Sequence, residues 1–164
     1  MNPVELIQSK RAHLTRLANQ HGAEGESSAL LDMEHWVPRP RGTGLKTLLD
    51  VLRASGISIK GSSFDAIALP PGQIVDFDDV EQVRRLLPEM VFIEIKTANQ
   101  PRVKPGFCGF FFALTEGEIL AAEALGSRHR VALYNKLTRE LLVTSVAVIL
   151  ARTRSSTWQL SVQL

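Results

Sequence analysis

The sequence has almost no cysteine: Cys108 is the only one among 164 residues. A single cysteine cannot form an intramolecular disulfide or a cysteine-rich zinc site. The four histidines show no zinc-ligand spacing, and there is no cysteine cluster for them to join. A disulfide-stapled scaffold and a zinc domain of the cysteine-rich kind are therefore both excluded.

The chain also lacks long apolar runs, and none approaches the ~18 residues of a membrane-spanning helix. Its first residues do not have the pattern of a signal peptide. The hydrophobic fraction of 45% and the charged fraction of 22% are ordinary for a folded globular protein. We therefore expect a cytoplasmic protein with no membrane association and a core of normal size.

Several catalytic motifs are absent as well. No G-x-S-x-G elbow of a serine hydrolase occurs, and Cys108 has no evident histidine base. The segment 42–47 resembles a phosphate-binding loop, but Leu45 separates Gly44 from Lys46 and no clear strand precedes it. These absences argue against nucleophilic serine or thiol chemistry and against a nucleotide-binding loop.

The net charge of +2 is too small to indicate nucleic-acid binding, but its distribution is uneven. Residues 60–94 carry three basic and seven acidic side chains, whereas residues 95–164 carry nine basic and four acidic ones. This asymmetry fits a metal site beside a phosphate-binding surface. It fits equally well with solvated charges on unrelated faces.

Hydrophobic periodicity and turn residues predict an α/β fold, a sheet with helices packed against it. Helices over 2–21 and 28–36 would form an N-terminal helical extension, residues 1–44, ahead of a main domain over residues 45–164. Within the main domain, the patterns predict helices over 45–56, 78–87 and 115–125. They predict strands over 57–60, 64–69, 91–97, 110–114, 131–137, 141–151 and 158–164.

The most informative of these segments is the strand 91–97. Side chains alternate faces along a strand, so Glu94 and Lys96 project to one side and Ile93 and Ile95 to the other. Burying two charges in an apolar strand costs free energy unless they form an ion pair, bind a metal or take part in catalysis. From composition alone, a chain of this length should contain about 0.6 D/E-x-K triplets by chance. The apolar strand around the triplet is therefore stronger evidence for a functional site than the triplet itself.

The preceding predicted strand contains Asp65, a residue type that strand interiors disfavour. If the two strands are neighbours, Asp65 and Glu94 can converge on one hard cation, with the Ile95 carbonyl as a further oxygen ligand. Mg²⁺ prefers such a set, with few carboxylates and retained waters. The alternative is a simple ion pair between Glu94 and Lys96, exposed at a strand end.

Four segments carry a family resemblance: Phe64-Asp65-Ala66-Ile67, Phe92-Ile93-Glu94-Ile95-Lys96-Thr97, Phe112-Ala113-Leu114-Thr115-x-x-Glu118 and Val131-Ala132-Leu133-Tyr134. Together they resemble the PD-(D/E)XK nuclease superfamily, most closely the branch that contains the C-terminal domain of plant NO VEIN proteins. The resemblance covers about residues 45–137. One departure is Phe64, which stands where the family has proline.

The resemblance implies a restriction-endonuclease-like mixed β-sheet flanked by helices. It implies that Asp65 and Glu94 bind Mg²⁺, with Mn²⁺ as a substitute, and that Lys96 assists the hydrolytic water. We therefore expect Mg²⁺-dependent hydrolysis of phosphodiester bonds in DNA, by a restriction- or defence-type endonuclease. The alternative is an inactive module of the same fold that binds nucleic acid or a partner protein.

Cutting both strands of a duplex with one site per chain would call for a homodimer, and a larger defence or repair complex would also fit the predicted activity. Basic residues in loops and turns near the site are candidates for phosphate contacts. They are Arg102, Lys104, Arg39, Arg41, Arg128 and Arg130. Glu118 has a sufficient explanation as part of a helix cap, Thr115-x-x-Glu118.

Overall fold

The computed structural model describes residues 2–21, 35–157 and 159–164, without the side chains of residues 14–21. The chain divides into two compact units, Met1–Ser27 with Val146–Leu164, and Ser28–Ser145. In the described part of the first unit, helix α1 (Pro3–His21) lies against helix α5 (Val146–Arg152). No helix in the described part of the chain is both long and apolar enough to cross a membrane.

Helix α1 begins where the sequence predicts. The Asn2 side-chain oxygen accepts a hydrogen bond from the Glu5 backbone N–H at 2.9 Å, and Glu5 accepts one from the Asn2 N–H at 2.9 Å. These reciprocal bonds satisfy two backbone donors that a helix start otherwise leaves without partners. Pro3 follows at the first helical position, where its missing N–H costs nothing.

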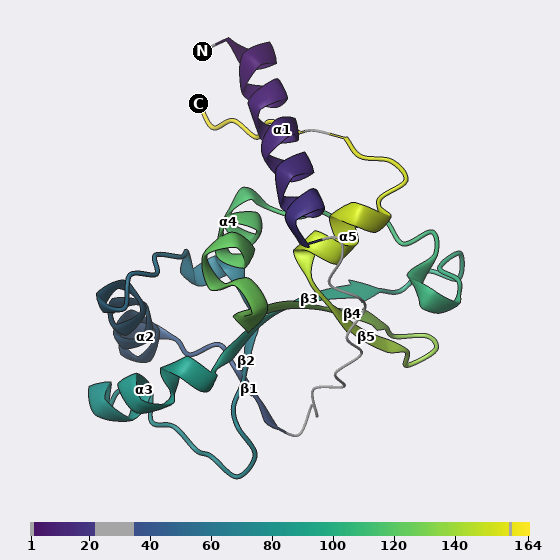
Figure 1. Cartoon of the computed structure of the whole chain (residues 1–164). Helices are drawn as coiled ribbons and strands as arrows, with labels where there is room; N and C mark the ends of the chain where they lie inside the picture. Colours follow the sequence, from purple (N-terminus) through teal and green to yellow (C-terminus); the bar gives the residue numbers. More distant parts are fainter. Residues whose placement is uncertain (1, 22–34, 158) are drawn as a thin grey trace. The chain divides into compact units, whose positions relative to one another are not determined.

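The second unit is an α/β fold built on a five-stranded mixed sheet of order β1-β2-β3-β4-β5 (Figure 1). Strands β3 and β4 are parallel, as a crossover connection that contains helix α4 allows, and the other neighbours are antiparallel. The strands are β1 (Trp36–Pro38), β2 (Ala66–Ala68), β3 (Val91–Ala98), β4 (His129–Asn135) and β5 (Leu141–Thr144). The helices are α2 (Gly42–Ala54), α3 (Val80–Leu86) and α4 (Glu116–Leu125).

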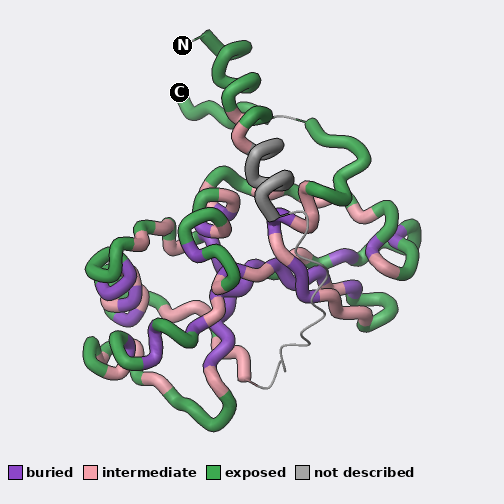
Figure 2. Tube along the Cα trace, in the orientation of Figure 1, coloured by how far each residue is buried: buried purple, intermediate pink, exposed green. Residues whose placement is uncertain are grey.

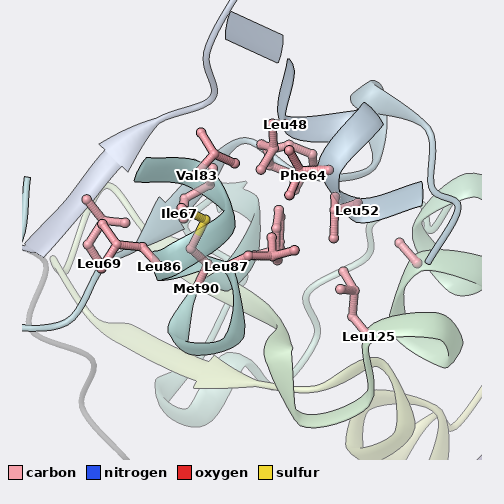
Figure 3. Close-up of a cluster of buried hydrophobic side chains, with 13 residues drawn as sticks. Leu48, Leu52, Phe64, Ile67, Leu69, Val83, Leu86, Leu87, Met90 and Leu125 are labelled. Carbon is pink, nitrogen blue, oxygen red and sulfur yellow. The ribbon is translucent and has the colours of Figure 1, made fainter. Parts of the chain in front are cut away.

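The main hydrophobic core joins α2, α3 and α4 to one face of this sheet (Figure 3). Phe92 of β3 is a fully buried member of this core, and its ring meets that of Phe64 edge to face, with 5.1 Å between the ring centroids. Edge-to-face rings are a favourable aromatic geometry. Because Glu94 and Lys96 share the strand face of Phe92, they also project toward the helices.

A second apolar cluster covers the other face of the central strands. It contains Ala66, Ala68, Ile93 and Ala132, all buried. Figure 2 shows the middle of the sheet as mostly buried. Residues 92–94 of β3 are thus buried on both faces of the sheet, whereas Ile95 is exposed.

The prediction of helices over 45–56, 78–87 and 115–125 is confirmed, with α2 beginning earlier, at Gly42. The strands predicted over 64–69, 91–97 and 131–137 are confirmed as β2, β3 and β4, with different ends. The predicted helix over 28–36 falls mostly on residues 28–34, outside the described residues. Its last residue, Trp36, instead begins β1, a strand that the sequence analysis missed.

Four strand predictions are wrong in whole or part. Residues 57–60 form no strand: Ile57 and Ile59 pack on the core from a loop, so their alternation reflects packing alone. Residues 110–114 also form no strand, and the rings of Phe110 and Phe112 instead pack together at 4.8 Å. Residues 141–151 divide at Ser145 into β5 and α5. Residues 159–164 lie in no strand.

Candidate active site

Asp65 lies at a bend where β2 begins, and its side chain is held against the edge of β3. Its backbone N–H donates to the Ile93 carbonyl at 2.7 Å, and its Oδ2 accepts from the Ile95 N–H at 2.9 Å. The Asp65 carboxylate therefore accepts the hydrogen bond from the Ile95 N–H that a backbone carbonyl would accept if the β2–β3 ladder continued. This bond accounts for an aspartate at a position where strand propensity disfavours one.

Glu94 and Lys96 form an ion pair in the interior of β3. The Lys96 Nζ lies 2.9 Å from the Glu94 Oε1, and the two side chains are only 14% and 8% exposed. The alternative to a metal site, on the sequence alone, was an ion pair exposed at a strand end. An ion pair is present, but it is buried, because α4 and the core cover this face of the strand.

Glu118 completes the group from the first turn of α4. Its Oε1 lies 2.9 Å from the same Lys96 Nζ, and its side chain is 6% exposed. Its Oε2 accepts from the Thr115 N–H at 2.9 Å, and its own N–H donates to the Thr115 hydroxyl. The predicted helix cap therefore exists, and the capping glutamate also contacts Lys96.

The sequence contains one signal for this contact. A helix that connects two parallel strands must pack back onto the sheet that it leaves. In the structure α4 connects the parallel strands β3 and β4, so its first turn lies over the sheet, and Glu118 is a charged residue in that turn. The missing information was which face α4 covers.

Burial and the neighbouring charges shift the pKa values of Glu94 and Lys96. Burial raises the pKa of the Glu94 carboxyl to about 7, from a usual value of 4.5. Lys96 acts in the opposite direction through its hydrogen bond and charge, while the charges of Glu118 and Asp65 add to the increase. For Lys96, burial alone would lower the pKa, but the bonds to Glu94 and Glu118 outweigh it and raise the pKa.

His129, at the start of β4, is a further buried polar residue that the sequence analysis left out of the site. It is 1% exposed, and its Nε2 lies 3.3 Å from the Ser63 carbonyl. Its Nδ1 has no hydrogen-bond partner in the part of the chain that the structure describes. Burial lowers the pKa of this imidazole, which is therefore neutral at pH 7.

The structure separates the predicted phosphate-binding residues into two groups. The Arg39 guanidinium donates to the Gly61 and Phe64 carbonyls at 2.9 Å each, and that of Arg128 donates to the Leu87 carbonyl at 2.9 Å. These two arginines hold backbone in place. Arg41, Arg102 and Lys104 are exposed, and Arg130 is half-buried.

A metal ion at this site would have few protein ligands. No cluster of three or more His, Cys, Asp or Glu side chains that could hold a metal forms among residues 2–21, 35–157 and 159–164. The candidate ligands are the Asp65 and Glu94 carboxylates and the Ile95 carbonyl. In a strand, the N–H and C=O of one residue point to the same side, so the Ile95 carbonyl faces the side of β3 that Asp65 occupies.

The fold and the site together define an α/β protein with a buried Glu–Lys–Glu cluster next to an exposed aspartate. Comparisons with protein-family models, with curated proteins and with solved structures found no match.

We expect replacement of Thr115 by alanine to lower the free energy of unfolding by about 1 kcal/mol, because it removes the hydroxyl that caps α4. Urea unfolding followed by circular dichroism measures the change. Thr115→Ser is the matched control, since it keeps the hydroxyl. An equal loss in both variants would show that the methyl group, and not the cap, stabilises this turn.

Proposed function

We propose that this protein hydrolyses phosphodiester bonds of DNA in a metal-dependent reaction, with Asp65, Glu94 and Lys96 as its site residues. The main observation in favour of the proposal is that the Asp65 carboxylate accepts a hydrogen bond from the Ile95 N–H, and Ile95 lies between Glu94 and Lys96 in the strand. A mixed sheet flanked by helices is also the general arrangement that the family resemblance implies.

The donor set fits Mg²⁺ better than it fits other common metals. Mg²⁺ is usually bound through one or two carboxylates, and waters and substrate phosphates complete its octahedral shell. A cage of three or more protein side chains is therefore not required. Asp65 and Glu94 would hold the ion, together with the Ile95 carbonyl, and the bound metal would polarise a phosphoryl oxygen and lower the pKa of a water ligand.

Lys96 supplies the positive charge beside these acids. Its ammonium would orient the attacking water or offset the negative charge that develops on the phosphate. While Glu94 serves as a metal ligand, Glu118 still holds the ammonium at 2.9 Å. Glu118 is thus a positioning residue in this proposal, and it is fixed in turn by its bond to the Thr115 N–H.

The test is cleavage of supercoiled and linear DNA in the presence of Mg²⁺ or Mn²⁺. Asp65→Asn is the sharpest variant, because Asp65 is exposed and asparagine keeps an oxygen for the Ile95 N–H. We expect cleavage to fall at least about 100-fold, since a metal contributes several kcal/mol to such a transition state. Asp50→Asn, an exposed aspartate on α2, is the matched control and should cleave as the parent does.

Two results would overturn the proposal. Equal cleavage by the parent protein and Asp65→Asn would place the reaction elsewhere or in a contaminant. No cleavage by folded parent protein with either metal would favour an inactive module that binds nucleic acid or a protein. The Lys96 ammonium held between two buried carboxylates is the specific observation that favours this second reading, because such a cluster also forms when it has only a structural role.

A further inference from the structure

Four exposed basic side chains belong to two segments that meet at the end of the sheet where β3 and β4 both finish. Arg102 and Lys104 belong to the segment 99–109, which follows β3, and Lys136 and Arg139 to the turn 136–140, which follows β4. The carboxyl ends of parallel strands meet at one edge of a sheet, so these two segments are neighbours in space. We call the four residues the basic patch.

Specific hydrogen bonds join the two segments. The Lys136 N–H donates to the Ala98 carbonyl at 2.9 Å, and the Gly106 N–H donates to the Glu140 carboxylate at 2.8 Å. Glu140 is the one acidic residue in either segment, and it is used in this contact. The patch therefore carries an excess of positive charge, and the one carboxylate near it, that of Glu140, joins the two segments.

The backbone beneath the patch is well anchored. In the first segment, Val103 and Phe107 are buried. In the second, the side-chain oxygen of the buried Asn135 accepts from the Leu137 N–H at 2.9 Å, and the Arg139 N–H donates to the Asn135 carbonyl at 2.8 Å. The four basic side chains thus extend from backbone that is held in place by burial and hydrogen bonds.

We propose that the basic patch binds the phosphate backbone of the nucleic acid next to the cleavage site. The inference rests on the proposed function and extends it with Lys136 and Arg139, which the sequence analysis did not select. The distance supports this partner. Ala98 ends β3 two residues after Lys96, a rise of about 7 Å, and the Lys136 N–H bonds its carbonyl. The patch therefore begins close to the candidate site along the same strand.

The experiment measures binding separately from cleavage. The parent chain is titrated into a fluorescently labelled DNA duplex in EDTA, and anisotropy is recorded over a series of salt concentrations. Each phosphate contact contributes about −0.9 to the slope of log K against log salt concentration. We expect Lys136→Gln with Arg139→Asn to make this slope shallower by about 2. Asparagine is chosen because Arg139 has φ +60°, which asparagine tolerates.

Arg102→Gln with Lys104→Gln is a second test pair, with the same expected change. Arg84→Gln with Arg85→Gln on α3 is the matched control, since it removes the same charge from exposed positions elsewhere in this unit. Equal changes in the control and in both test pairs would overturn the patch, and so would an absence of binding by the parent chain at low salt.

The outcomes also separate the patch from the proposed nuclease activity. Binding that depends on the patch, without cleavage by any form, would sustain the patch and refute the nuclease. Cleavage of DNA whose binding does not depend on the patch would do the reverse. Binding to anionic lipid vesicles instead of to the duplex would refute the patch as a nucleic-acid surface.

Discussion

Replacing Lys96 with methionine should lower the free energy of unfolding at pH 8 by about 3–5 kcal/mol. The substitution keeps most of the apolar stem but removes the ammonium that lies 2.9 Å from both Glu94 and Glu118. Two carboxylates would then face each other at a buried position without a counter-charge. Removing one partner of a buried ion pair is costly for this reason, whatever the pair itself contributes.

The loss should be smaller at pH 5 than at pH 8, because the two carboxyls in the variant can take up a proton and cease to repel each other. Urea unfolding at both pH values, followed by circular dichroism, measures the difference. Lys46→Met is the matched control, since Lys46 also bonds a carboxylate, Asp50, at 2.7 Å, but this pair is exposed. Surface pairs contribute about 0–1 kcal/mol. Equal losses of unfolding free energy for the two lysine variants would show that the Glu–Lys–Glu cluster is solvated in solution.

Replacing Glu94 with glutamine should make the protein more stable than the parent above pH 7 and change little near pH 4.5. The folded carboxyl, with a pKa of about 7, binds a proton more tightly than the unfolded one at 4.5. Between these values the folded state holds more protons, so the parent loses stability as the pH rises. Glutamine cannot ionise, and the variant should lack this loss, which is on the order of 3 kcal/mol.

The measurement is the difference in unfolding free energy between parent and variant from pH 4.5 to pH 8.5. Taking the difference cancels the titration of distant groups, although Asp65, Glu118 and Lys96 face Glu94 and remain coupled to it. Glu89→Gln, in the exposed turn before β3, reports the effect of removing a surface carboxylate under the same conditions. Parallel curves for the parent and Glu94→Gln would contradict the raised pKa.

Much of the fold was predictable because the signals were local. The leucines of α2, the capping residues of α1 and α4, and the alternation in β3 are each set by neighbours within a few positions along the chain. The errors have a different origin. Whether a short apolar segment such as 57–60 or 110–114 pairs as a strand depends on a partner that is distant in sequence. Strand β1, with three residues ending at Pro38, gave no periodic signal at all.

The candidate site divides in the same way. Alternation of side chains along any strand is enough to place Glu94 and Lys96 on one face of the strand. The packing of the elements places α4 over this face, brings Glu118 to Lys96 and lets the Asp65 carboxylate accept from the Ile95 N–H; none of these contacts can be read from the sequence. It also brought Lys136 and Arg139 beside the segment 99–109. These contacts join residues from separate elements, and their distances depend on how the helices and strands pack.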